Sequence, residues 1–343
     1  MMLLAETLPP LPEPLPATPL SAFDAVLYGA VQGIGEFLPI SSSTHLKLLS
    51  RLLASAGRQP IDEVSIMLFH LPTLAAVCWV LRKEIRALFG AQRALLWPLA
   101  LATGVTGALG YPLHKRFDTW GSSLAFLGAA LCLTGLTQLL VERFRPEARE
   151  GPWTWDRGIA VGLGQALAGI PGLSRLGMST CAGLLTGRPH VQAVTFSFLC
   201  AIPVTAGMTA LECRKALEAG EPGFWTHRVL YGAYPLGALV AFVLGVLTFR
   251  WLLARLRRGT LVPFGIYCVV LGSLTLIWPL AQGRMPPSEP AVAPKQSPRT
   301  ESDDPRTPEG NPGLGDDGAA VPAPDQPDLV RPQGPPEPPL PPP

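Results

Sequence analysis

Charged residues are scarce in this 343-residue chain. Lys, Arg, Asp and Glu make up 15% of the sequence, and 48% of the residues are apolar. Soluble proteins average about 25% charged residues, so the composition argues against an ordinary soluble domain. A signal peptide is not expected either, because Met1–Leu20 lacks a basic segment and is interrupted by prolines.

Cysteine pairs with the spacing of metal ligands are also missing. The six cysteines lie mostly inside apolar runs, with no CxxC spacing and no histidine in ligand register. We interpret them as small buried apolar residues. They are Cys78, Cys132, Cys181, Cys200, Cys213 and Cys268.

Prolines concentrate at the two ends of the chain. Residues 1–20 hold six and residues 282–343 hold nineteen of the 39. We expect one membrane domain over 21–281, between a Pro-rich disordered arm and a Pro-rich acidic disordered tail. The domain carries a net charge of +9, which suits an anionic lipid or phosphate substrate. Positively charged cytoplasmic loops account for that charge equally well.

Six apolar stretches are long enough to span a membrane, which takes about 20 residues. They are 64–81, 94–113, 121–141, 190–211, 229–249 and 261–281.

Two further apolar regions, 22–56 and 158–187, are each interrupted by a polar, Pro-containing turn. Each arm is too short to span, so the pattern predicts two re-entrant helical hairpins. Irregular backbone at membrane depth is tolerated only where it is buried in protein or lines a wet cavity. Two such breaks indicate one internal polar site.

The order of these segments predicts an inverted repeat with halves 21–145 and 155–281. Gln32 precedes Pro39 much as Gln165 precedes Pro171. Three spans per half is an odd number, so the second half must be inverted in the membrane. Loops 82–93, 142–157 and 250–258 carry twelve Lys and Arg against five in the other two loops, which places the first set in the cytoplasm.

The first break places a carboxylate, several hydroxyls and a histidine within ten residues of an apolar hairpin. Ionisable groups at membrane depth are candidates for function. Glu36 and His45 suit acid–base chemistry or a cation, and a serine near His45 suits a nucleophile. A satisfied structural turn is the alternative.

The second break contains Arg175, an always-charged side chain between two apolar arms. Its guanidinium can bind a phosphate bidentately, and the amides that begin the following helix add affinity for an anion. A structural ion pair with Glu36 is the alternative, and the two roles are compatible. We interpret His70, alone in an apolar span, as a structural residue with a supporting role in the site left open.

Four segments resemble the undecaprenyl-diphosphatase family, the bacitracin-resistance type. EFLPISSSTHL at 36–46 is similar to the family's EFLPVSSTGHL, and QALAGIPGLSRLG at 165–177 is similar to QxLAxxPGxSRSG. FSFLCAIP at 196–203 and FGIY at 264–267 follow in the family's order. The match covers roughly 22–281.

The resemblance implies an all-α polytopic fold with two re-entrant hairpins and six transmembrane helices. It implies hydrolysis of undecaprenyl diphosphate to undecaprenyl phosphate and phosphate, aided by Mg²⁺ or Ca²⁺. That reaction recycles the lipid carrier of peptidoglycan synthesis and confers bacitracin resistance. The expected location is the bacterial inner membrane, with the active site toward the outer face.

The residues that fall on the family's motifs define the expected site. We expect catalysis from Glu36, Ser42, His45 and Arg175, with Glu36 also the metal ligand; the choice of nucleophile stays open. We expect substrate contacts from Gln32, Ser41, Ser43, Gln165 and Ser174.

The chain departs from the family's motifs at four positions. These are Gln32 for glutamate, Thr44 for glycine, Leu176 for serine and Cys268 for a basic residue. The first removes a carboxylate that helps to hold a cation, and the third removes a phosphate-facing hydroxyl.

A second hypothesis is a weakly catalytic or non-catalytic transporter or flippase of the polyprenyl phosphate, because inverted repeats are common in transporters. In either case the expected partners are a polyprenyl diphosphate lipid and the membrane. A nucleic-acid partner is not expected, and a homodimer is left open.

Overall fold

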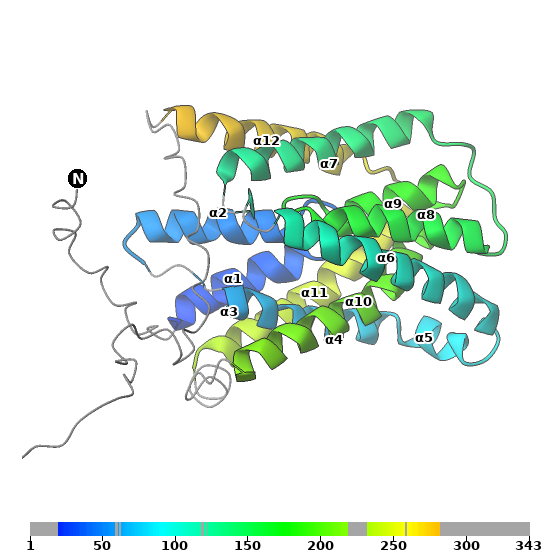
Figure 1. The fold of residues 1–343 in the computed structure, drawn as a ribbon, viewed down its shortest axis with the longest axis horizontal. Helices are drawn as coiled ribbons and strands as arrows, with labels where there is room; N and C mark the ends of the chain where they lie inside the picture. The colour runs from blue at the N-terminus through cyan, green and yellow to red at the C-terminus, as the bar shows by residue number, and fades with distance from the viewer. Residues whose placement is uncertain are drawn as a thin grey trace, which may run out of the picture. The chain divides into compact units, whose positions relative to one another are not determined.

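The structure of the protein, a computed structural model, describes residues 20–58, 61, 63–117, 120–121, 123–218, 232–257 and 259–281. Every regular element within these ranges is a helix, which confirms the predicted all-α class (Figure 1). The predicted tail and all but the last residue of the predicted arm lie outside the described residues.

The helices follow one another with short connections. In the first half of the chain they are α1 (Ala22–Gly35), α2 (Ser42–Ser55), α3 (Glu63–Leu68), α4 (His70–Val80), α5 (Arg82–Leu88), the 3₁₀ turn η1 (Arg93–Leu95), α6 (Leu96–Phe117) and α7 (Leu124–Phe144). In the second half they are α8 (Trp155–Ala166), the 3₁₀ turn η3 (Leu167–Gly169), α9 (Arg175–Leu185), α10 (His190–Glu218), α11 (Tyr234–Leu256) and α12 (Val262–Ala281).

Four helices are long and apolar enough to cross a membrane, and a bent pair raises the number to five. The four are Arg93–Phe117, Leu124–Phe144, His190–Lys215 and Tyr234–Leu256. They correspond to four of the six predicted spans.

The other two predicted spans differ from expectation. The span expected at 64–81 is divided into α3 and α4, and Ser65–Val80 bends by 72° into α5. Pro72 lies in the first turn of α4, where its missing N–H leaves no hydrogen bond unmade. At 261–281, the strongly apolar part of α12 is the shorter segment Val262–Trp278.

Both interrupted regions form two short helices joined by irregular backbone. Residues 36–41 separate α1 from α2, and the segment from η3 to Ser174 separates α8 from α9. The α1–α2 pair lies in the left half of the helical body in Figure 1, and the α8–α9 pair lies in the right half. The two irregular segments therefore approach each other in the middle of the described domain.

Small residues let α1 and α8 pack closely on long helices. A Cβ added to Gly29 would lie 2.2 Å from the carbonyl oxygen of Gly237 in α11, and one added to Gly162 would lie 2.7 Å from that of Ala102 in α6. Such close backbone contacts are typical of helix packing in membranes. The small residues recur every four positions: Ala25, Gly29 and Gly33 in α1, and Gly158, Gly162 and Ala166 in α8.

A buried aromatic cluster fixes the backbone of the first break. Phe37 is fully buried, and its ring centroid lies 5.5 Å from that of Phe198 in α10 and 5.3 Å from that of Phe249 in α11. Offset aromatic pairs at these distances add to the stabilisation from burial. The backbone next to Glu36 is thereby anchored in the apolar core.

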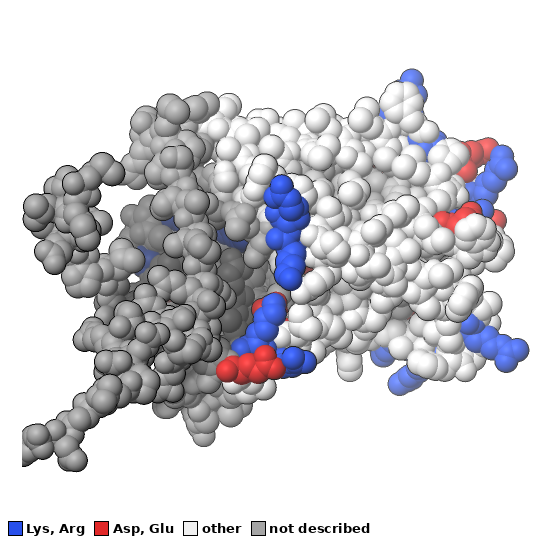
Figure 2. All heavy atoms as spheres, in the orientation of Figure 1, with Lys and Arg blue, Asp and Glu red and all other residues white. Residues whose placement is uncertain are grey.

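On the face that Figure 2 shows, charged side chains lie in a column left of centre and in a group at the right-hand end. An uncharged band separates these two groups of Lys, Arg, Asp and Glu on the visible face. An uncharged band of this kind suits the hydrocarbon layer of a bilayer. Together with the apolar helices, it indicates a multi-pass membrane protein.

Candidate active site

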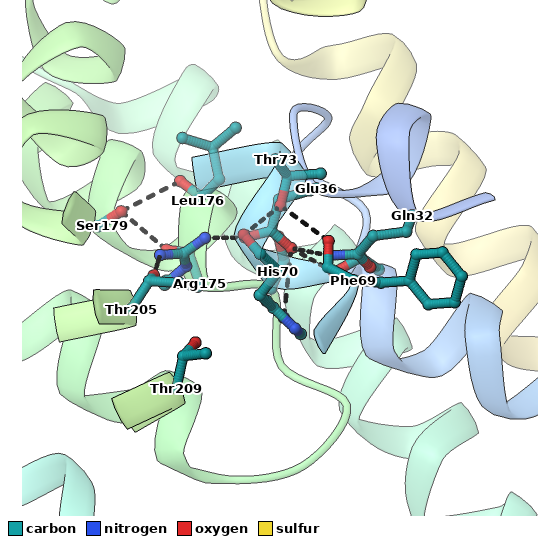
Figure 3. Close-up of polar contacts among 12 residues, drawn as sticks. Gln32, Glu36, Phe69, His70, Thr73, Arg175, Leu176, Ser179, Thr205 and Thr209 are labelled. Carbon is teal, nitrogen blue, oxygen red and sulfur yellow. Dashed lines mark hydrogen bonds and ion pairs between the residues drawn. The ribbon is translucent and has the colours of Figure 1, made fainter. Parts of the chain in front are cut away.

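Glu36 and Arg175 meet where the two interrupted regions approach each other (Figure 3). Glu36 directly follows α1, and Arg175 is the first residue of α9. Arg175 Nη2 donates to Glu36 Oε1 in a hydrogen-bonded ion pair. The Glu36 side chain is 7% exposed and that of Arg175 is 23% exposed. The ion pair that the sequence offered as the alternative role of Arg175 is thus present, and it stays accessible from the arginine side.

The second carboxylate oxygen of Glu36 collects three further groups. Ser42 Oγ donates to Oε2 at 2.8 Å, and Gln32 Nε2 donates to the same atom at 3.2 Å. His70 Nε2 lies 3.8 Å from it, within ion-pair reach. Four elements, α1, α2, α4 and α9, therefore contribute to one carboxylate.

Local structure explains why these side chains converge. Gln32 precedes Glu36 by four residues and so lies on the same face of α1. Gly35 allows the start of α2 to come close, because a Cβ at this position would lie 3.1 Å from Ser42 Cα. Ser42 and Arg175 are each the first residue of a helix that follows a break.

Arg175 is also held on its other side. Its Nη1 donates to Thr205 Oγ1 in α10 at 2.7 Å, and its backbone carbonyl accepts from Ser179 Oγ at 2.7 Å. The guanidinium therefore bridges Glu36 and Thr205 (Figure 3).

Ser41, Ser43 and His45 form a neighbouring group that does not contact Glu36. Ser41 Oγ lies 3.0 Å from Thr44 Oγ1 and 3.4 Å from Ser43 Oγ. His45 Nδ1 donates to the Ser41 carbonyl at 2.8 Å, and its Nε2 lies 2.8 Å from the hydroxyl of Tyr267 in α12. The histidine expected beside the reactive serine thus faces α12, and Glu36 is the group that contacts Ser42.

Ser174 and Gln165 lie in the second interrupted region and do not contact the ion pair. Ser174 Oγ accepts from the Gly177 amide at 3.1 Å and caps α9, and the Ser174 amide donates to Thr134 Oγ1 at 3.1 Å. Gln165 Nε2 donates to Thr106 Oγ1 at 3.4 Å. Ser174 precedes Arg175 directly, so it lies beside the ion pair along the chain.

Two residues at the ion pair were missed as primary site residues by the sequence reasoning. The sequence indicates a structural role for His70, a lone histidine in an apolar segment, and leaves only a supporting role in the site open. Thr205 gave no signal, because a threonine two residues after Pro203 in an apolar helix is unremarkable as a sequence pattern. Thr205 contacts Arg175 and His70 contacts Glu36, each across 30 or more residues of sequence, and these contacts assign both residues to the site.

The four departures from the family motifs fall in two kinds of surroundings. Gln32 is part of the site, bonded to Glu36. Leu176 is buried in the apolar core, and Cys268 Sγ donates to the Pro39 carbonyl at 3.7 Å. Thr44 Oγ1 bonds to Ser41 Oγ. Thr44 and Cys268 thus bond to residues of the first break and Leu176 packs in the apolar core, whereas Gln32 bonds to the carboxylate itself.

The donor set around Glu36 fits a cation only with help from the substrate. Within the described ranges, no group of three or more His, Cys, Asp and Glu side chains is arranged to hold a metal. However, Gln32 Oε1 is buried beside Glu36 and accepts no hydrogen bond from any described group. Mg²⁺ and Ca²⁺ bind oxygen ligands, and phosphate oxygens often complete their shells.

This arrangement combines three chemical capacities. The guanidinium can bind a phosphate bidentately. The carboxylate accepts the hydroxyl hydrogen of Ser42, as a general base for a serine nucleophile would. The Glu36 side chain is buried among groups from α1, α2, α4 and α9, and burial strengthens electrostatic interactions. Transfer of a phosphoryl group is the reaction class that uses all three.

Comparison with known proteins identifies the family. The model of the family described as bacitracin resistance protein BacA matches residues 25–274. Undecaprenyl-diphosphatase of Rhodopirellula baltica is 34% identical over 257 residues, covering 74% of this chain and 96% of that protein. The protein of the same name from Myxococcus xanthus is 35% identical over 78% of this chain and 92% of its own length. Undecaprenyl-diphosphatase 1 of Shouchella clausii is 35% identical over 77% and 99%. This chain belongs to the bacitracin resistance protein BacA family.

Proposed function

We propose that this protein is an undecaprenyl-diphosphate phosphatase of the bacterial cell membrane. It removes the terminal phosphate from the lipid diphosphate and returns the lipid monophosphate to the cycle that builds peptidoglycan. The contact of Arg175 and Ser42 with the two oxygens of one carboxylate is the observation that carries the proposal. The family membership supports it along most of the chain.

Substrate binding begins at Arg175. The terminal phosphate of the lipid displaces Glu36 Oε1 from the guanidinium and takes two parallel hydrogen bonds from it. Release of this contact leaves Glu36 bonded to Ser42 and Gln32. The phosphate thereby replaces Glu36 as the counter-ion of Arg175. The Glu36 carboxylate is then available as the base for Ser42.

The chemical step uses Ser42 as the nucleophile. Its Oγ attacks the terminal phosphorus while its proton passes to Glu36 Oε2, 2.8 Å away. The bond from phosphorus to the bridging oxygen breaks, and that oxygen leaves with the lipid monophosphate. Glu36 passes the serine proton to the departing lipid phosphate and is ionised again. A water molecule then attacks the phosphorus of the phosphoserine and gives a proton to Glu36. The seryl oxygen is the leaving group, inorganic phosphate is released, and Ser42 recovers that proton from Glu36.

His70 and His45 have different places in this scheme. His70 Nε2 faces the same oxygen as Ser42 and helps to orient the carboxylate. His45 is bonded to Tyr267, so its predicted catalytic role, like the predicted substrate contacts of Ser41, Ser43, Ser174 and Gln165, requires the lipid headgroup to reach beyond the ion pair. These roles remain part of the proposal.

A divalent cation is part of the proposed reaction. Glu36 and the unpaired Oε1 of Gln32 would hold it together with diphosphate oxygens. A bound Mg²⁺ or Ca²⁺ supplies positive charge that stabilises the charge developing on the phosphate oxygens. Arg175 supplies charge at the same centre from the protein side.

The proposed membrane arrangement is an inverted repeat with two re-entrant hairpins, α1–α2 and α8–α9. Helix packing supports it: α1 packs on α11 as α8 packs on α6, α4 packs on α11 as α10 packs on α6, and α7 pairs with α12. Exchange of the two halves preserves this pattern. The hairpins occupy opposite halves of the body in Figure 1, as the inversion requires.

The proposed orientation places the active site toward the outer face. The ends of α7 and α11 and the start of α8 lie at the same end of the described domain (Figure 1). Three of the basic loops adjoin that end, among them 142–157, which favours the cytoplasm. The hairpin that carries Glu36 and Ser42 enters from the other side.

The transporter alternative is not favoured. The relatives reported above carry the name of a diphosphatase, and a Ser42 hydroxyl aimed at a carboxylate serves chemistry better than it serves transport.

Phosphate release from undecaprenyl diphosphate by the purified protein in detergent tests the proposed function. We expect release with Mg²⁺ or Ca²⁺, a strong decrease with a chelator, and a loss of about 10³-fold in Arg175→Ala, which removes the main charge on the phosphate. Glu36→Gln should lose a similar factor. Folded protein that binds the lipid but releases no phosphate with any cation would refute the proposal.

A further inference from the structure

Thr205 of α10 is the second anchor of the Arg175 guanidinium. Arg175 Nη1 donates to Thr205 Oγ1 at 2.7 Å while Nη2 donates to Glu36. A guanidinium can only donate, so the threonine oxygen is the acceptor in this contact. Thr205 is half-buried, and it lies beside Arg175 in Figure 3.

The hydroxyl hydrogen of Thr205 is left available by this contact. Helical threonines usually donate that hydrogen to the carbonyl four residues earlier. Four threonines of this protein do so in the described helices, namely Thr73, Thr106, Thr134 and Thr275. Thr205 makes no such bond, and no acceptor among the described residues takes its hydrogen. The Thr205 hydroxyl therefore stays free to donate to another group, and it lies beside the Arg175 guanidinium that binds the phosphate.

We propose that Thr205 is a further phosphate-binding and positioning residue. It holds Nη1 in place when the phosphate replaces Glu36 on Nη2, and it donates its own hydrogen to an oxygen of that phosphate. The ligand is a terminal phosphate or diphosphate anion. This inference rests on the proposed function, and it adds a donor from α10 to a site otherwise formed by α1, α2, α4 and α9.

The proposed role of Thr205 depends on its hydroxyl and not on the shape of its side chain. Three variants separate these two properties. Thr205→Val keeps the shape and removes the hydroxyl, whereas Thr205→Ser keeps the hydroxyl. Thr209→Val is the matched control, because Thr209 lies one turn further along α10, is buried, and contacts Met67 Sδ at 3.8 Å. Figure 3 shows Thr209 apart from the Arg175–Glu36 contact.

The steady-state kinetics of phosphate release test this inference. A hydrogen bond to a charged group contributes enough to predict a loss of about 10- to 100-fold in kcat/KM for Thr205→Val, with a raised KM. Thr205→Ser should stay within about threefold of the wild type, and Thr209→Val within about twofold. Thermal unfolding in detergent identifies any variant that fails to fold. Thr205→Val behaving like Thr209→Val, or Thr205→Ser being as impaired as Thr205→Val, would overturn the inference.

Binding of inorganic diphosphate separates this inference from the proposed function. The affinity can be measured without turnover, so it is informative even if the wild type releases no phosphate. Weaker binding by Thr205→Val than by Thr205→Ser supports the Thr205 contact in that case as well. Equal affinity of the wild type and Thr205→Val for diphosphate overturns it, whatever the activity.

Discussion

The two interrupted regions solve the same geometric problem with different residues. Each needs a sharp turn before a new helix begins, and in each the backbone enters the left-handed region. The second break uses Gly172, with φ of +93°, for this turn. The first uses Ser41, with φ of 68°, and Ser41 is the only non-glycine residue with positive φ in the described part of the chain. A side chain in this conformation is unfavourable by roughly 1–2 kcal/mol.

The N-caps of α2 and α9 also differ, and again the second break has the more favourable local structure. Ser174 closes the start of α9 through its side chain, as an N-cap serine ordinarily does. Ser41 occupies the corresponding position before α2 but makes no cap hydrogen bond there. The second break is therefore locally satisfied, whereas the first retains strain, and its Ser42 hydroxyl bonds to Glu36 instead of capping the backbone. Strain of this kind collects at functional sites, and it supports the proposal that the first break carries the reaction and the second binds the anion.

Removal of the Ser42 hydroxyl should give the largest difference between the breaks. Ser42→Ala loses the proposed nucleophile, and we expect phosphate release to fall by about 10²–10⁴-fold. Ser55→Ala is the control in the same helix, because Ser55 Oγ only donates to the Leu52 carbonyl at 2.7 Å at the exposed end of α2. Acid quenching with substrate labelled in the terminal phosphate should trap a phosphoserine in the wild type alone. Ser42→Ala with activity within fivefold of the wild type would exclude Ser42 as the nucleophile.

Substitutions at the two left-handed residues should change stability in opposite directions. Gly172→Ala forces a side chain into positive φ and places its Cβ 2.8 Å from Ala130 Cβ, so we expect the unfolding free energy to fall by about 1–3 kcal/mol. Ser41→Gly relieves the same strain, and we expect a gain of up to about 1 kcal/mol, reduced by the greater freedom of glycine in the unfolded chain. Denaturation in detergent micelles measures both.

Gly104→Ala is the control for this pair, because a Cβ at Gly104 meets nothing within 4 Å. It lies inside α6, so it should be neutral or stabilising by up to about 1 kcal/mol. If Gly172→Ala and Ser41→Gly change the unfolding free energy with the same sign, the two turns are not comparable. Backbone strain then does not distinguish them.

The sequence alone predicts the helical class and the positions of the breaks, and it offers the ion pair as the alternative role of Arg175, for a physical reason. Glu36 and Arg175 are ionisable groups in apolar surroundings, and such groups at membrane depth must find each other or a ligand. The other side chains that contact this ion pair cannot be predicted in the same way. His70 and Thr205 reach the site only through the packing of α4 and α10, and neither residue type is unusual in a helix.

The same limit applies to the number of spans and to His45. Period and length predict a span over 64–81, but the interruption at Phe69 between α3 and α4 depends on how the chain packs around it. Sequence proximity suggests that His45 serves Ser42. In the structure, the helical geometry of α2 turns His45 toward Tyr267, while the turn at Ser41 brings Ser42 onto Glu36.

The smallest expected effect concerns the two glutamines that precede the breaks. Gln32 Nε2 bonds to Glu36, whereas Gln165 Nε2 bonds to Thr106 in α6. Gln32→Glu adds a second carboxylate to the proposed cation site. We expect the Mg²⁺ or Ca²⁺ concentration for half-maximal activity to fall severalfold, because more negative ligand charge strengthens the binding of these ions. At saturating cation the rate should stay within about threefold of the wild type, and without cation it should fall as the two carboxylates repel each other.

Gln165→Glu is the matched variant in the second region, because it adds the same charge away from Glu36. The prediction sets no condition on the rate of Gln165→Glu. The cation concentration for half-maximal activity of this variant should equal that of the wild type. Titration of phosphate release with Mg²⁺ in both variants makes the comparison. An equal shift in both would mean that the net charge of the domain sets the cation affinity. A shift in Gln32→Glu alone would place the cation at the first break, beside the serine whose reaction it assists.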